Sequence, residues 1–224
     1  MIFKILHIVP DDKFIDGAID TFNQTSSINT YVSIDAVESF TYIKSHAAEV
    51  QILSKETLLP LILNGRYHLV AFHTLPRDKY ELALQIPRHI KVLWLSWGYD
   101  LYSPVEKMPA ILPIELYKPL TNKLINPREK VSPYKRLKRL IKRVIYYKKY
   151  RIAYLEEQRV IQDEIRMQKA LLSRIDYMST VLPSEYEMLS QLEGFHAEYF
   201  PFQYAFKDDF SFGDMYDNAD KILL

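Results

Sequence analysis

Residues 92–102 read Val-Leu-Trp-Leu-Ser-Trp-Gly-Tyr-Asp-Leu-Tyr, and this stretch decides how the rest of the chain is interpreted. Its first half is apolar and holds no charged residue, as in a strand that is buried on both faces of a sheet. The run breaks at Gly98, whose backbone freedom suits a sharp exit from a strand. Asp100 follows two residues later. Because open α/β sheets bind ligands just past the carboxyl ends of their strands, the sequence predicts a ligand site here.

Short apolar runs alternate with helical patterns on both sides of this stretch. Strands that alternate with helices of this length predict an α/β, Rossmann-like fold, with a mostly parallel sheet covered by helices on both faces. Asn64-Gly65 is expected to cap the end of the second helix, and Ser184 with Glu187 has the form of a capping box at the start of the last one. We predict strands at 2–9, 30–34, 50–53, 68–73, 90–96, 177–181 and 197–200, and helices at 18–22, 55–63, 78–85 and 184–192.

The segment 103–173 interrupts this alternation. Its first part is rich in proline and carries no strand signal, and two long helical patterns follow at 135–150 and 152–173. We interpret the segment as a basic helical insertion within a Rossmann-like domain that covers residues 1–206. Residues 207–224 read as a linker and the first strand of a further C-terminal domain, which the sequence given does not contain.

Positive charge is concentrated in residues 128–151. This stretch holds eleven lysines or arginines and one acidic residue, whereas the rest of the chain holds 18 basic and 27 acidic residues. A solvated helix face and a nucleic-acid contact are alternatives, but no nucleic-acid-binding motif accompanies the run. A basic helix with an apolar stripe favours an anionic membrane surface instead. The predicted membrane contacts are Lys135, Arg136, Arg139, Lys142 and Arg143.

Several classes of site are excluded by the residues that are missing. There is no cysteine, so the chain has no disulfide and no cysteine nucleophile or metal ligand. The five glycines form neither a dinucleotide-binding fingerprint nor a phosphate-binding loop. The six histidines show no metal-ligand spacing, so we predict no cofactor and no bound metal. No apolar run reaches the ~18 residues that a membrane-spanning helix needs.

Three predicted strands end in polar or aromatic residues that could share one edge of the sheet. The first passes His7 and leads into Lys13, the fourth ends at His73, and the fifth ends near Asp100. A carboxylate, imidazoles and aromatic rings are the groups that bind and activate a sugar hydroxyl. The other residues of this predicted crevice are Trp97, Gly98 and Tyr102.

Each of these residues also has a plainer interpretation. His7 could be a hydrogen-bonded histidine of a core strand, and Asp100 could serve only to form the turn after Gly98. Trp97 could belong to the core. Asp11 and Asp12 could hold a divalent ion, although capping of the following helix is the simpler reading.

The segment Trp97-Gly98-Tyr99-Asp100-Leu101-Tyr102 resembles the W-G-x-D-L-Y pattern of the bacterial TDP-N-acetylfucosamine:lipid II N-acetylfucosaminyltransferases, glycosyltransferase family 56. The first strand with His7 and the later proline- and lysine-rich region are similar to that family as well. The resemblance implies the N-terminal half of a GT-B enzyme, which works at the cytoplasmic face of the membrane without a required metal. It further implies that a nucleotide-sugar donor binds the C-terminal half and that a lipid-linked saccharide is the acceptor.

The resulting hypothesis is an acceptor-binding domain of a membrane-associated glycosyltransferase for surface polysaccharide, peripheral on the inner face of the cell membrane. Asp100 would orient or deprotonate the acceptor hydroxyl, with His73 as a supporting group. Trp97, Gly98, Tyr102 and His7 would line the sugar site, and Lys13 would meet the lipid diphosphate. On its own the chain is expected to be inactive, because the donor half is missing. The alternative is a non-catalytic α/β module that binds a membrane or a glycan.

Overall fold

The computed structural model describes residues 2–35, 38–102, 110–112 and 147–202, with the backbone alone for 147–150. Within these residues seven parallel strands form one sheet in the order β3-β2-β1-β4-β5-β6-β7, so the predicted α/β, Rossmann-like fold is confirmed. All seven predicted strands are present. Their bounds are β1 Lys4–Ile8, β2 Ile28–Ser33, β3 Val50–Ile52, β4 Leu69–His73, β5 Lys91–Leu95, β6 Tyr177–Ser179 and β7 Glu198–Tyr199.

The chain divides into two compact units. The first consists of Met1–His73 with Pro201–Leu224, and the second of Thr74–Phe200. Strands β3, β2, β1 and β4 belong to the first unit, and β5, β6 and β7 belong to the second. Each unit is described below by itself.

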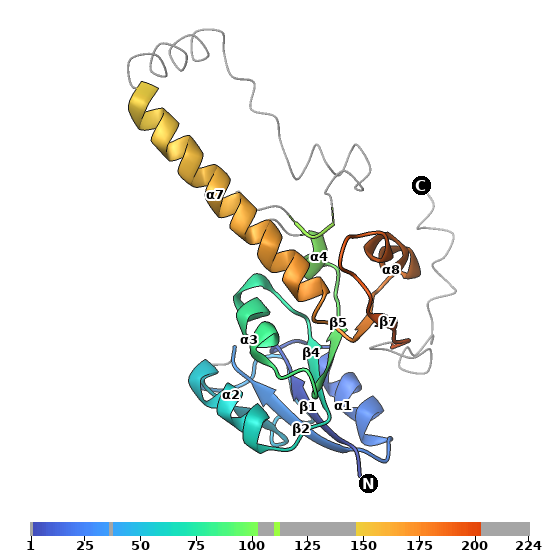
Figure 1. Ribbon diagram of the computed structural model, residues 1–224. Helices are drawn as coiled ribbons and strands as arrows, with labels where there is room; N and C mark the ends of the chain where they lie inside the picture. The colour runs from blue at the N-terminus through green and yellow to red at the C-terminus, as the bar shows by residue number, and fades with distance from the viewer. Residues whose placement is uncertain (1, 36–37, 103–109, 113–146, 203–224) are drawn as a thin grey trace, which may run out of the picture. The chain divides into compact units, whose positions relative to one another are not determined.

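In the first unit, two helices cover opposite sides of the strands, as Figure 1 shows for α1 (Ile15–Asn23) and α2 (Lys55–Asn64). Helix α1 buries Ile15, Ala18, Ile19 and Phe22, which recur every three or four residues and so form one apolar stripe. Strand β1 lies between β2 and β4. The chain order therefore reverses beside β1, and the ends of β1 and β4 meet at the switch point where α/β sheets bind ligands.

In the second unit, α7 (Tyr147–Leu172) is the long helix that is yellow to orange in Figure 1. Its C-terminal half packs against the unit through Leu171 and Leu172, and through the buried carboxylate of Glu164, which accepts a 2.6 Å hydrogen bond from Arg77 Nε. The other helices among the described residues of this unit are η1 Arg77–Lys79, α3 Tyr80–Gln85, α4 Tyr99–Tyr102 and α8 Pro183–Ser190.

Three details of the helices differ from the prediction. Helix α7 runs without a break through residues 150–152, where two separate helices were expected. Gly65 does follow α2, but its φ of −75° is ordinary, and the left-handed residue is Arg66 with φ 52°. Glu185, not Glu187, caps the start of α8 by accepting the N–H of Leu182, which is the N-cap residue because Pro183 occupies the first helical turn.

The predicted strand at 219–224 and the helical pattern at 135–146 lie outside the described residues. So do all five predicted membrane contacts, Lys135, Arg136, Arg139, Lys142 and Arg143.

Candidate functional site

The buried carboxylate of Asp100 organises the end of β5 in the second unit. Only 8% of the residue is exposed, and its two oxygens accept five hydrogen bonds. The donors to Oδ2 are the Thr74 hydroxyl (3.1 Å), the Leu75 N–H (3.1 Å) and the Trp94 indole N–H (2.7 Å), and those to Oδ1 are the Ser96 hydroxyl (2.8 Å) and the Trp97 N–H (3.1 Å).

These five hydrogen bonds limit the ability of Asp100 to accept a proton from a substrate. A carboxylate offers about four lone-pair sites, so five donors occupy all of them. An incoming sugar hydroxyl would have to displace one of these donors before it could transfer a proton to Asp100. The geometry favours a positioning role, in which Asp100 ties the segment after β4 to the segment after β5. Its catalytic role stays a prediction.

Thr74 shows that the segment after β4 is held under strain. Its φ is 80°, in the left-handed region that β-branched residues avoid, and it is 1% exposed. Its N–H donates to the Leu95 carbonyl at 2.9 Å, and its hydroxyl lies 2.9 Å from the Tyr99 hydroxyl as well as beside Asp100. Strain of this kind costs of order 1–3 kcal/mol and persists where surrounding contacts impose it, which is common at functional sites.

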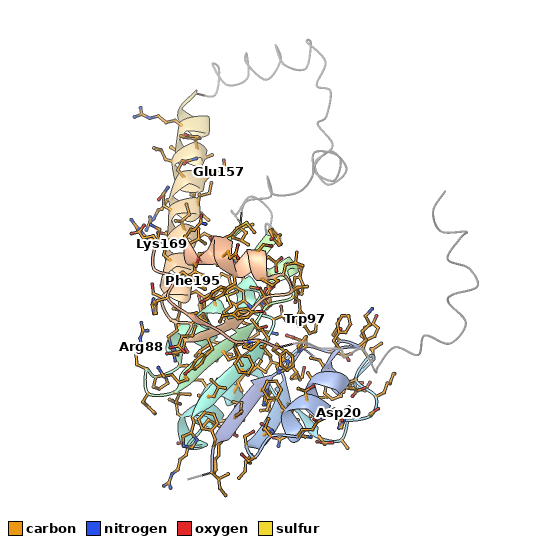
Figure 2. The ribbon with its side chains drawn as sticks, turned by 90° about the vertical axis from the view of Figure 1, so that its right-hand side faces the viewer. Asp20, Arg88, Trp97, Glu157, Lys169 and Phe195 are labelled. Atoms are coloured by element: carbon orange, nitrogen blue, oxygen red, sulfur yellow. The ribbon has the colours of Figure 1, made fainter. Side chains whose placement is uncertain are left out.

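The predicted sugar-site residues Trp97, Gly98 and Tyr102 lie on this segment of the second unit. Gly98 has a φ of 85°, so glycine is required for the sharp exit from β5 that the sequence predicted. The chain then enters the single turn of α4, where the Leu101 and Tyr102 N–H groups donate to the Gly98 carbonyl. Trp97 and Tyr102 are both partly exposed, and Figure 2 labels Trp97. Tyr99 is 47% exposed.

The predicted histidines lie together in the first unit. His7 Nδ1 is 3.1 Å from His73 Nε2, and both residues are fully buried. His7 Nε2 is 3.2 Å from the Asn29 side-chain oxygen, which can only accept, so His7 carries its proton on Nε2 and receives the His73 N–H on Nδ1. Aromatic rings of Phe22, Tyr31 and Phe202 surround the pair.

Burial keeps both histidines neutral. Desolvation lowers the pKa of His7 to about 3, although its hydrogen bond with Asn29 acts in the other direction. Desolvation also lowers the pKa of His73 well below its usual value, and the neighbouring His7 adds to the effect. His7 is thus a hydrogen-bonded histidine in a core strand, which was the alternative interpretation from the sequence. Substrate binding by His7 and catalysis by His73 stay predictions.

Asp11 has a structural partner in the first unit, and so does Asp16. Asp11 accepts hydrogen bonds from the backbone N–H groups of residues 41–43, and Asp16 accepts those of residues 44–46. Partial burial acts to raise the pKa of each carboxyl, but the backbone donors outweigh it and lower both. Lys13 is exposed just before α1, with its ammonium 5.0 Å from the centre of the Phe14 ring.

The predicted crevice residues thus fall into two groups. His7, His73 and Lys13 belong to the first unit, whereas Trp97, Gly98, Asp100 and Tyr102 belong to the second. Among the described residues no group of three or more histidine or acidic side chains is arranged to hold a metal ion.

Two buried residues near the Gly98 turn were missed in the sequence analysis. Thr74 directly follows the predicted strand 68–73, and no sequence pattern indicates a threonine in the left-handed region. Glu185 could have been found, because Pro183 marks the first turn of α8 and places Glu185 at its third position. Glu185 is 4% exposed, and its Oε1 is 3.8 Å from the position that a Cβ on Gly98 would take.

Comparisons with protein-family models, with curated protein sequences and with solved structures found no match. None of the helices in the described part of the chain is both long enough and apolar enough to cross a membrane.

Proposed function

We propose that this chain is the acceptor-binding domain of a membrane-associated glycosyltransferase, which transfers a sugar from a nucleotide-sugar to a lipid-linked saccharide in surface polysaccharide synthesis. The supporting observation is the setting of the Trp97–Tyr102 segment. It follows a parallel strand, at the edge where α/β proteins bind ligands, and Asp100 fixes its shape through five hydrogen bonds. A loop held in this way loses little conformational entropy when a ligand binds.

Within this proposal the partly exposed residues Trp97 and Tyr102 line the sugar site, because a sugar ring stacks its C–H face on an aromatic side chain while its hydroxyls bind polar groups. Gly98 lets the backbone approach the ligand closely. Asp100 keeps the turn in the binding shape. Binding of the lipid diphosphate by Lys13, an exposed residue of the first unit, stays a prediction.

Membrane attachment falls to the basic segment 128–151, which carries a net charge of +10. Each basic residue near an anionic surface contributes on the order of 1 kcal/mol, so a few simultaneous contacts hold a peripheral protein at low salt. In the described residues the segment leads into the first turns of α7, where Ile152 and Leu155 are exposed apolar side chains. These fit the lipid boundary on the cytoplasmic face of the membrane.

The test of the enzyme uses the protein made from the full open reading frame. It is incubated with polyprenyl-diphosphate-linked N-acetylglucosamine and a panel of nucleotide-activated hexoses and N-acetylhexosamines, and the lipids are analysed by mass spectrometry. The proposal expects one donor to give a glycolipid that is heavier by one sugar. Trp97→Ala is expected to raise the KM for the acceptor, while Tyr154→Ala, an exposed change on α7, is not.

The alternative is a non-catalytic module that binds a glycan or a membrane. It is favoured if no donor yields a product while the chain still binds the lipid-linked acceptor. Attachment is measured separately, by sedimentation with phosphatidylglycerol vesicles and with phosphatidylcholine vesicles. Binding to the anionic vesicles alone, weakened by salt, supports the membrane assignment, and equal absence from both vesicles contradicts it.

A further inference from the structure

The second unit contains another carboxylate beside the Gly98 turn, that of Glu185 on α8. Strands β5 and β6 are parallel neighbours, with Leu95 opposite Ser179, and the Ser96 N–H donates to the Ser179 carbonyl at 2.8 Å. The segments that leave these two strands therefore start from the same edge of the sheet. The first carries Gly98, and the second leads within a few residues to α8, whose Glu185 is 96% buried.

The two oxygens of Glu185 have different surroundings. Oε2 accepts a 3.0 Å hydrogen bond from the N–H of Leu182, the N-cap residue of α8. Oε1 is on the Gly98 side, and no described residue donates a hydrogen bond to it. Each oxygen of an ionised carboxylate has about two lone-pair sites for hydrogen bonds. Oε1 therefore has the capacity to accept a further donor.

There is also room for a ligand atom beside this oxygen. Among the described residues, and apart from the adjacent residues of the chain, a Cβ added to Gly98 would have only Oε1 of Glu185 within 4 Å, at 3.8 Å. The described residues therefore leave the space over the Gly98 Cα open, with a carboxylate oxygen at its border. Asp100, by contrast, has five donors on its two oxygens. Of the two carboxylates, only Glu185 offers an oxygen that can accept a substrate hydroxyl without losing an existing bond.

We infer that Glu185 is the catalytic base of this site, with its Oε1 accepting the hydroxyl group of the acceptor sugar above Gly98. The inference rests on the proposed transferase function. The hydroxyl proton moves to Oε1 as the hydroxyl oxygen forms a bond to the anomeric carbon of the donor. The bond between that carbon and the nucleotide diphosphate breaks, and its electron pair leaves with the diphosphate. Oε2 keeps the Leu182 hydrogen bond throughout, which holds the carboxylate in place.

The test compares Glu185→Gln with the unchanged protein, in the full-length enzyme and the glycolipid assay described above. Glutamine keeps an oxygen that can accept the Leu182 hydrogen bond, but it cannot take up a proton. Because general-base catalysis contributes typically 10²–10⁴-fold, we expect kcat to fall by about 10² or more with little change in the KM for the acceptor. The acid limb of the pH–rate profile, which reports protonation of the base, should disappear in the variant.

Glu187→Gln is the matched control, because Glu187 is exposed on the same helix and two residues away. It should retain the kcat and the pH profile of the unchanged enzyme. Thermal unfolding of both variants checks that α8 is intact. If Glu185→Gln keeps kcat within twofold, or if it loses activity only in proportion to lost folded protein, Glu185 is not the base although the transferase function stands. If the unchanged enzyme transfers no sugar, the proposed function itself fails and this inference fails with it.

Discussion

The two units stabilise buried polar side chains at strand ends in different ways. Each has polar side chains buried at the carboxyl end of a central strand, where hydration is lost. In the first unit the pair is His7 and His73, which stay neutral, bind each other and are surrounded by aromatic rings. In the second unit Asp100 meets five hydrogen-bond donors from neighbouring residues.

The difference teaches how to interpret a polar residue at a strand end. A histidine can join a core by giving up its charge, because its ordinary pKa is close to neutrality. A carboxylate near neutral pH finds donors instead, and these donors fix the backbone that carries them. The first arrangement fills the core between β1 and β4. The second shapes a turn at the sheet edge, which is why we place the candidate site in the second unit.

Removing the acceptor at Asp100 is expected to have the largest effect. Asp100→Asn replaces one carboxylate oxygen by an NH2 group, which would face at least two buried donors. Each donor left without a partner costs about 1–3 kcal/mol, so we expect a loss of about 3 kcal/mol in the free energy of unfolding. Both tryptophans, Trp94 and Trp97, belong to the second unit, so urea unfolding followed by tryptophan fluorescence reports on this unit.

Glu81→Gln, which alters an exposed acid of α3 in the same unit, controls for the loss of one negative charge. A change below 0.5 kcal/mol at Asp100 would contradict the five-donor arrangement, because surface substitutions typically stay within about that range.

The histidine pair should make the free energy of unfolding depend on pH, because both rings stay neutral in the folded state. Unfolded histidines take up protons near pH 6.5, whereas His7 resists protonation down to a pKa of about 3 and the pKa of His73 is also well lowered. Between these pH values the unfolded state binds more protons, so the free energy of unfolding falls as the pH drops below about 6.5. In His73→Phe, the difference in bound protons between the unfolded and folded states should fall by about one, so the free energy of unfolding should decrease less steeply with falling pH.

Histidine NMR titration measures the same property directly, and His46 supplies the contrast. His46 Nδ1 is 2.6 Å from Glu49 and Nε2 is 2.8 Å from Asp20. Burial acts to lower the pKa of His46, but these two carboxylates raise it overall. Its stabilising contribution is complete below the unfolded value of 6.5 and is lost as the pH rises through the higher folded value. A His7 ring that titrated above pH 6 would contradict the neutral pair.

The sequence was sufficient to predict the sheet, because buried parallel strands are short apolar runs and seven of them are visible. It also placed Gly98 at the exit from β5, since no other residue type suits that turn so well. It could not show that Asp100 is saturated with donors. Three of these donors come from segments before Ser96, and their convergence depends on tertiary packing that no local pattern records.

The capping of α8 shows a different limit. Ser184 with Glu187 matches a capping box as a pattern, whereas Pro183 marks an earlier start of the helix and makes Glu185 the capping side chain. Two overlapping local signals were present, and proline decides between them because its fixed φ suits the first turn of a helix. The serine pattern was wrong, and with it the orientation of Glu185 toward Gly98 was missed.

Asp16 in the first unit tests whether greater exposure lowers the stability cost of replacing a carboxylate that accepts several hydrogen bonds, compared with Asp100. Asp16 accepts three backbone N–H groups, of residues 44–46, but it is only partly buried. Water can replace the lost acceptor there, so Asp16→Asn should cost about 1 kcal/mol. Hydrogen exchange of residues 44–46 should quicken by roughly fivefold, which corresponds to that free energy. Asp12→Asn, which keeps an oxygen that can accept the Phe14 N–H, should leave these amides unchanged.

The substitution Gly98→Ala separates the shape of the turn from its function. The φ of 85° costs alanine about 1–2 kcal/mol, but the new Cβ would make only an ordinary 3.8 Å contact with Glu185. Gly194→Ala, at a φ of 87°, adds a Cβ 2.6 Å from Ser173 Oγ and should therefore cost more. Tryptophan fluorescence ranks the two variants in urea.

The same pair then tests the open space above Gly98. A methyl group there would occupy the position assigned to the acceptor hydroxyl, so Gly98→Ala should weaken acceptor binding by about tenfold or more although it is the more stable variant. Gly194→Ala should bind normally once it is folded. If binding instead follows stability in both variants, the space over Gly98 holds no ligand, and the difference between the two units concerns folding alone.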